Sequence, residues 1–151
     1  MGELIYKTSN DDALQKFKID SDDIAYFSEQ KITKAQPVVL VFSVNGEDIG
    51  FVKFDLRVFN RNAYITYYVV PKYRGQGYGK AMLKKAIEFA FGEMNLHRLT
   101  AEVYAYNEKS IRLLESLGFV REGLIREAKF HDNKYWDILI MGVLKEEARR
   151  K

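Results

Sequence analysis

Residues 69–80 read Val-Val-Pro-Lys-Tyr-Arg-Gly-Gln-Gly-Tyr-Gly-Lys, and this stretch decides how the rest of the chain is expected to fold. It follows an apolar, strand-like segment and precedes one with helical periodicity, so it should connect a strand to a helix. Gly75, Gly77 and Gly79 keep β-carbons out of the turn, so its backbone N–H groups can approach a ligand closely. Those groups would also lie at the positive end of the helix. The stretch therefore predicts an anion site suited to a diphosphate.

The spacing of this turn does not fit two other phosphate-binding motifs. A mononucleotide P-loop needs a glycine five residues before its Gly-Lys pair and a hydroxyl residue after it, but Arg74 and Ala81 occupy those positions. A Rossmann fingerprint spaces its glycines G-x-G-x-x-G, whereas this chain has G-x-G-x-G. It also opens a domain, whereas this turn comes after an antiparallel pattern.

Strand and helix patterns on both sides of the turn predict the architecture. Asn45-Gly46 is a hairpin signal, because both residues tolerate positive φ. Strands are expected at residues 4–8, 38–44, 49–59, 63–70, 99–106, 119–130 and 135–144, with helices near Asn10, from Ser21, at 77–91 and from Asn107 to Gly118. This order predicts an α/β (α+β) fold: a mixed, mostly antiparallel central sheet of six to seven strands with helices on both faces. The length fits a single domain, residues 1–151.

Composition narrows the class of protein. The chain has 151 residues, a net charge of +3 and no cysteine. It therefore lacks a disulfide framework, a thiol nucleophile and cysteine metal sites. Charge this balanced does not indicate a nucleic-acid partner, and no apolar run approaches membrane length. His97 and His131 are isolated, so no metal site is expected. We expect a cytoplasmic protein.

The glycine-rich turn resembles the acetyl-CoA signature of the GNAT superfamily of N-acetyltransferases, [Q/R]-x-x-G-x-[G/A], with Arg74, Gly77 and Gly79 at its defined positions. Residues 107–119 resemble the later motif of that family, N-x-x-[S/A]-x-x-[L/I]-x-x-x-x-G-F. Residues 123–141 resemble, in part, the branch that holds ribosomal-protein N-terminal and spermidine or diamine acetyltransferases. The two motifs cover about residues 63 to 120.

The resemblance implies an enzyme in which a primary amine attacks acetyl-CoA directly in a ternary complex. The acceptor would be a protein N-terminus, a polyamine or another small amine. In this family the strand before the turn splays from its neighbour, and its free backbone groups pair with the pantetheine arm. The implied coenzyme-binding residues are Tyr68, Val69, Val70, Arg74, Gly75, Gln76, Gly77, Tyr78, Gly79, Lys80 and Asn107. A backbone N–H near Val69 would stabilise the oxyanion.

The catalytic groups are less evident. Many relatives carry the general acid on a tyrosine where this chain has Leu114. Ser110 is a candidate acid and Glu102 a candidate base, although a helix-start serine that bonds the backbone and a solvated strand glutamate are the simpler explanations. A coenzyme A-binding sensor or assembly module without catalysis therefore remains an alternative.

Three further features stay open. Tyr64, Tyr67, Tyr68, Tyr104 and Tyr106 lie on the two strands that flank the turn. Alternation places Tyr64 and Tyr68 on one face and Tyr67 on the other, so sheet packing is the main expectation and one or two could line the acceptor site. Acidic residues near two early helices would suit a polyamine or simply a solvated face: Asp20, Asp22, Asp23 and Glu29. A homodimer through the final strands is also considered.

Overall fold

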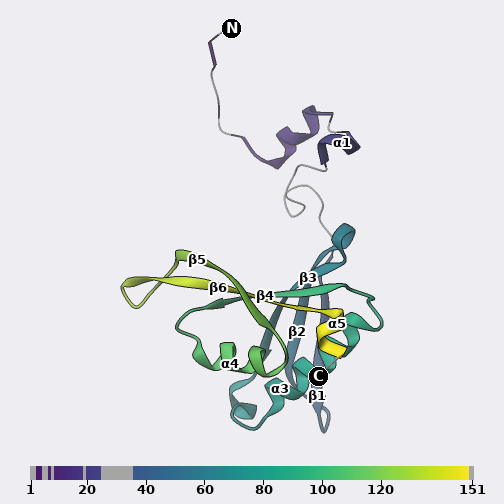
Figure 1. Ribbon diagram of the computed structural model, residues 1–151, viewed down its shortest axis with the longest axis vertical. Helices are drawn as coiled ribbons and strands as arrows, with labels where there is room; N and C mark the ends of the chain where they lie inside the picture. Colours follow the sequence, from purple (N-terminus) through teal and green to yellow (C-terminus); the bar gives the residue numbers. More distant parts are fainter. Residues whose placement is uncertain (1–2, 5–6, 8, 19, 25–35, 150–151) are drawn as a thin grey trace. The chain divides into compact units, whose positions relative to one another are not determined.

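The computed structural model describes residues 3–4, 7, 9–18, 20–24 and 36–149 (Figure 1). The chain divides into two compact units, Met1–Thr33 and Lys34–Lys151. The first unit contains a 3-10 helix, η1 (Asp11–Lys16), and a short helix, α1 (Ser21–Ile24). Asn10 Oδ1 accepts a hydrogen bond from the Asp12 N–H at 3.0 Å, so Asn10 caps this turn, although the turn is 3-10 rather than α. The expected strand at 4–8 falls mainly outside the described residues, as does Glu29.

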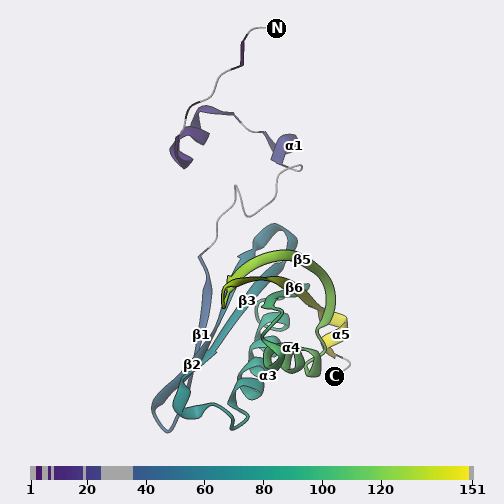
Figure 2. The same ribbon diagram turned by 90° about the vertical axis from the view of Figure 1, so that its left-hand side faces the viewer.

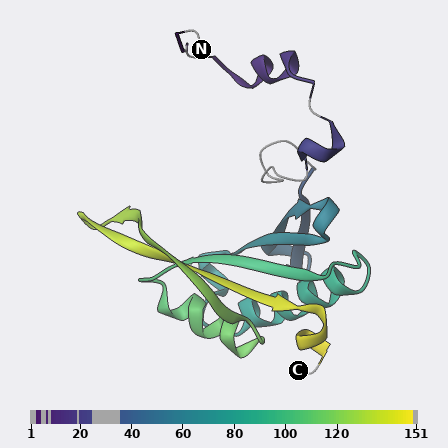
Figure 3. The same cartoon turned by 45° about the horizontal axis from the view of Figure 1, so that its top comes forward.

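The second unit is built on a six-stranded sheet with the order β1-β2-β3-β4-β6-β5 (Figures 1 and 3). Its strands are β1 (Val38–Val44), β2 (Glu47–Arg57), β3 (Asn62–Val69), β4 (Arg98–Tyr104), β5 (Val120–His131) and β6 (Lys134–Leu144). Only β3 and β4 are parallel; every other neighbouring pair is antiparallel. The mixed, mostly antiparallel sheet is therefore confirmed.

Tight turns reverse the chain between β1 and β2 and between β5 and β6. Asn45 and Gly46 have φ of 51° and 81°, and Asp132 and Asn133 have φ of 55° and 59°. Two consecutive positive φ values are typical of type I′ turns, whose twist matches that of the flanking strands. The strand expected to reach residue 59 ends earlier, because the 3-10 helix η2 (Val58–Asn60) follows it.

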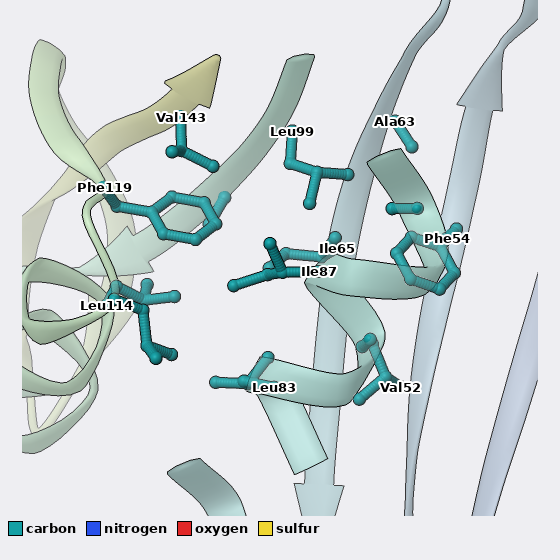
Figure 4. Packing of buried hydrophobic residues seen from close by; sticks show 14 of the residues in the cluster. Val52, Phe54, Ala63, Ile65, Leu83, Ile87, Leu99, Leu114, Phe119 and Val143 are labelled. Carbon is teal, nitrogen blue, oxygen red and sulfur yellow. The ribbon is translucent and has the colours of Figure 1, made fainter. Parts of the chain in front are cut away.

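The two long helices, α3 (Tyr78–Phe91) and α4 (Glu108–Ser116), lie against the same face of the sheet (Figure 2). The face of α3 that the sequence predicted is the buried one: Met82, Leu83, Ala86, Ile87, Ala90 and Phe91. In Figure 4, Leu83 and Ile87 lie among side chains of β2 and β3, and Leu114 lies near Phe119. A short 3-10 helix, η3 (Pro71–Tyr73), precedes the glycine turn, and α5 (Lys145–Arg149) ends the described chain.

The parallel strands at the centre of the sheet separate after a short contact. β3 and β4 pair only at Asn62–Arg98, Ala63–Leu99 and Tyr64–Thr100. Beyond that point β3 stays paired with β2 as far as Val69, and β4 stays paired with β6 as far as Tyr104. The facing edges of β3 and β4 are therefore open over their second halves, as expected for strands that splay apart.

Candidate active site

The glycine turn has a backbone conformation that requires its glycines. Gly75 has φ of 73° and Gly77 has φ of 88°, both in the left-handed region where side chains are rarely found. A β-carbon added at either position would meet no atom within 4 Å. The space outside these two residues is therefore open, and the glycines serve the shape of the turn rather than internal packing.

The N–H groups of this turn come before the first hydrogen bond of α3. The first helical hydrogen bond of α3 runs from the Ala81 N–H to the Gly77 carbonyl at 3.2 Å, and no side chain caps the helix. Within the described part of the chain, the backbone N–H groups of residues 75–80 have no hydrogen-bond partner. Such a run of free donors at a helix N-terminus favours an anionic ligand.

Side chains around the turn hold its shape and do not cover the free N–H groups. Arg74 Nε donates to the Val69 carbonyl at 2.8 Å, and Gln76 Nε2 donates to the Lys72 carbonyl at 3.0 Å. Tyr73 Oη donates to the Glu47 carboxylate at 2.6 Å, which lowers the pKa of Glu47. The Arg74 and Gln76 side chains thus support the backbone of the turn, and the groups left without a hydrogen bond in this described stretch are main-chain amides.

Strand register determines which backbone groups reach the open edge of β3. The Val70 N–H donates to the Ile49 carbonyl at 2.8 Å, so Val70 faces β2. Because hydrogen-bonding direction alternates along a strand, Tyr68 also faces β2, whereas Tyr67 and Val69 face the gap beside β4. Of the three residues expected to offer backbone groups to the gap, only Val69 does so, because Tyr68 and Val70 face β2. Tyr67, which was not expected, also offers its backbone there.

The first turn of α4 brings Ser110 to the same gap. Asn107 Oδ1 accepts a hydrogen bond from the Ser110 N–H at 3.2 Å, which confirms Asn107 as the N-cap. Ser110 is buried, and its Oγ lies 2.5 Å from the Oη of Tyr67. Leu114, one turn later, is fully buried in the core, and its side chain offers no proton.

Tyr67 is half-buried between β3 and α4. Burial raises the pKa of its phenol, and the hydrogen bond with Ser110 partly offsets that rise. The phenol is therefore held in its protonated form at neutral pH. The sequence indicated only that Tyr67 lies on the opposite face from Tyr64 and Tyr68; its partner on α4 is 43 residues away.

Glu102 lies apart from Ser110. It follows Ala101 and precedes Val103 on β4, and both of those side chains are buried in the core that α3 and α4 cover. Alternation therefore directs Glu102 to the opposite face, where it is exposed. The two candidate catalytic residues thus lie on opposite faces of the sheet, and the open edges of β3 and β4 separate them.

A polar network joins the strands where β3 and β4 still pair. Arg98 on β4 forms a two-point ion pair with Glu122 on β5, which raises the pKa of the Arg98 guanidinium. Arg98 Nη1 also donates to Thr100 Oγ1 at 3.1 Å, and Thr100 Oγ1 lies 3.3 Å from Asn62 Oδ1 on β3. The network links β3, β4 and β5 next to the residues at which β3 and β4 stop pairing.

Comparison with known proteins identifies the family. The sequence pattern described as "Acetyltransferase (GNAT) family" matches residues 4–119, and the chain belongs to that family. It is 28% identical over 152 residues to the SPbeta prophage-derived uncharacterized N-acetyltransferase YokL of Bacillus subtilis, covering 95% of this chain and 85% of that one. It is 29% identical over 100 residues to a spermidine N(1)-acetyltransferase of Vibrio cholerae, covering 66% of this chain and 58% of the relative.

A solved structure agrees with these sequence relatives. The dodecameric spermidine N-acetyltransferase from Vibrio cholerae superposes with a TM-score of 0.69 and 27% identity, covering 73% of this chain and 66% of that chain. Among the described residues, no helix is long and apolar enough to cross a membrane. In the same residues, no three histidine or carboxylate side chains are grouped so that they could hold a metal ion.

Proposed function

We propose that this chain transfers the acetyl group of acetyl-CoA to a primary amine by direct attack in a ternary complex. The observation that carries the proposal is the run of unpartnered N–H groups at residues 75–80, beside the open edge of β3. The amides suit the diphosphate of coenzyme A, and the edge suits the amides of its pantetheine arm. Bound there, the cosubstrate supplies an acetyl group activated as a thioester.

The protein residues would then bind and orient the cosubstrate and polarise its thioester. The turn from Arg74 to Lys80 would hold the diphosphate, and the backbone of Tyr67 and Val69 would pair with pantetheine as an added strand would. Asn107 has its side-chain oxygen committed to α4, so its NH₂ group remains for pantetheine. The Val69 N–H faces the gap and would stabilise negative charge on the thioester oxygen.

Alignment of the two reactants supplies much of the rate. Holding an amine against the thioester can be worth up to ~7–11 kcal/mol of barrier. Glu102, exposed on the opposite face of β4, would accept the proton that the attacking ammonium loses. Ser110 lies on the α4 side, where the leaving sulfur needs a proton.

The acceptor class rests on the relatives. One observation favours a polyamine: spermidine acetyltransferases are among the similar proteins. A protein N-terminus or another small amine is the competing acceptor.

We propose that the protein also self-associates through β5, because this edge strand exposes Val120, Leu124 and Ile125, and the Vibrio cholerae enzyme is dodecameric.

A turnover screen tests the proposal. Acetyl-CoA would be offered with polyamines, amino acids, aminoglycosides and N-terminal peptides, and release of free thiol would be followed. Calorimetry would measure coenzyme A binding in parallel, with a Gly77→Val variant that should bind poorly because valine cannot adopt the φ of 88° found there. Binding without turnover of any amine would favour a coenzyme A-binding sensor, which Leu114 in place of tyrosine also favours. Absence of binding would refute the proposal.

A further inference from the structure

The hydrogen-bonded hydroxyls of Tyr67 and Ser110 are the one polar pair that joins the open half of β3 to α4 among the described residues. Their oxygens are 2.5 Å apart, and the Ser110 side chain is buried. Ser110 is not needed to cap its own helix, because Asn107 already accepts its N–H. The pair is therefore not needed to cap α4, and it joins α4 to the half of β3 beside which the acetyl thioester is proposed to bind.

The other tyrosines of β3 and β4 have different surroundings. The Arg74 guanidinium lies over the Tyr68 ring, and the Arg57 guanidinium lies over the Tyr64 ring. Tyr104 stacks on Tyr106 and is exposed. Of the tyrosines on these two strands, Tyr67 alone directs its hydroxyl to α4.

The chemistry of the leaving group selects between the two hydroxyls. A departing thiolate has a proton affinity like that of cysteine, with a pKa of about 8.5, and an ordinary phenol, with a pKa of about 10, is the nearer match even though burial raises the pKa of Tyr67. An aliphatic alcohol is a far weaker acid, so Ser110 alone would protonate the sulfur poorly. The Tyr67 phenol is therefore the more suitable acid, and the Ser110 hydroxyl is placed to orient it.

We infer that Tyr67 is the catalytic proton donor to the departing thiolate, and that Ser110 is a positioning residue that orients its hydroxyl. The inference rests on the proposed acetyl transfer. The amine nitrogen bonds to the acetyl carbon, the carbon–sulfur bond breaks, and sulfur takes the phenolic proton. The amine loses one proton to a base, and the phenolate regains one from solvent through the Ser110 hydroxyl, so the balance is an amide and a free thiol.

The test combines kinetics with a binding measurement that does not depend on turnover. Tyr67→Phe removes one oxygen and should lower kcat by about 100-fold while leaving KM for acetyl-CoA unchanged. Tyr135→Phe, at an exposed position on β6, is the matched control and should retain the wild-type kcat. Ser110→Ala should lower kcat by about 10-fold, and Ser110→Thr, which keeps the hydroxyl, should restore most of it.

The second readout compares coenzyme A with desulfo-coenzyme A by calorimetry. A phenol that donates to sulfur should make coenzyme A bind about fivefold tighter than the desulfo analogue, and Tyr67→Phe should reduce that ratio to about one. A Tyr67→Phe variant with the wild-type kcat, or with the wild-type binding ratio, overturns the inference. Failure of the wild-type protein to bind either compound refutes the proposed function itself, whereas binding with an unchanged ratio refutes only the role of Tyr67.

Discussion

Replacing Gly142 by alanine should destabilise the fold, because the added methyl group would enter the space between Arg98 and Glu122. Gly142 lies on β6, between the two strands that carry the ion pair, and its missing side chain leaves room for the pair to cross the sheet. A β-carbon there would collide with Glu122 Oε1 and Arg98 Nη1. The ends of both side chains would have to shift, which should weaken the ion pair and the hydrogen bond from Arg98 to Thr100.

The size of the effect follows from two opposing contributions. Hydrogen bonds to charged groups are worth about 1.5–3 kcal/mol, and partial exposure reduces this to roughly 1–2 kcal/mol, since the Arg98 and Glu122 side chains are 27% and 33% exposed. Alanine favours a strand over glycine by roughly 0.5–1 kcal/mol, which offsets part of the loss. The net destabilisation should be about 1 kcal/mol, or a fall in Tm of about 2–4 °C for a domain of this size.

Thermal or urea unfolding measures the effect, with Gly123→Ala as the matched control. Gly123 also lies in a strand, but a β-carbon there would meet only Ile140 Cβ at 4.0 Å, so the control should be neutral or slightly stabilising. In a Glu122→Ala background Gly142→Ala should lose its cost, since the main obstacle is gone. A Gly142→Ala protein that melts at or above the wild-type temperature would show that the added methyl group does not disturb the ion pair, as would an equal cost in both backgrounds.

Three further predictions follow from the site. Ser110→Ala should raise the pKa of Tyr67 further, because the serine hydrogen bond lowers it; difference absorbance of tyrosinate against Tyr67→Phe would measure this, and a downward shift would contradict it. Asn107→Ala should cost about 1 kcal/mol by removing the N-cap of α4 and should also weaken coenzyme A binding; unchanged values in unfolding and calorimetry would count against both roles. The hydrogen bond from Tyr73 lowers the pKa of Glu47, so this contact should persist above the ordinary glutamate pKa of about 4.3 and be lost as pH falls through the lowered folded value; a carboxyl NMR titration with a midpoint at or above that pKa would argue against it.

Local patterns in the sequence were enough to predict the elements that surround the turn. Three of these signals act within a few residues of their own position: the alternate glycines, the apolar stripe of α3 and the capping Asn107. Because such signals are local, the sequence alone is enough to predict the structure they produce. Asn45-Gly46 predicted its hairpin for the same reason. The expected strand end at Phe59 was wrong, because residues 58–60 form a 3-10 helix in spite of their apolar side chains.

The parts that the sequence did not predict depend on residues far apart in the chain. The pairing of Tyr67 with Ser110 requires β3 and α4 to be placed together, and strand register, which no local signal sets, decides that Tyr67 rather than Tyr68 faces the gap. Gly142 appears as an ordinary strand glycine until Arg98 and Glu122 are seen on either side of it. The candidate catalytic pair could therefore be found only from the tertiary structure, whereas the conformation of the glycine turn was predicted from the sequence alone.

Amide NMR tests, without any substitution, whether the bare amides of residues 75–80 bind the diphosphate of coenzyme A. Coenzyme A would be titrated into ¹⁵N-labelled protein, with pantetheine, which lacks the diphosphate, as the control ligand. The N–H resonances of Gly75, Gly77 and Gly79 should shift most with coenzyme A and little with pantetheine. Saturating binding that leaves these three resonances unmoved would contradict it.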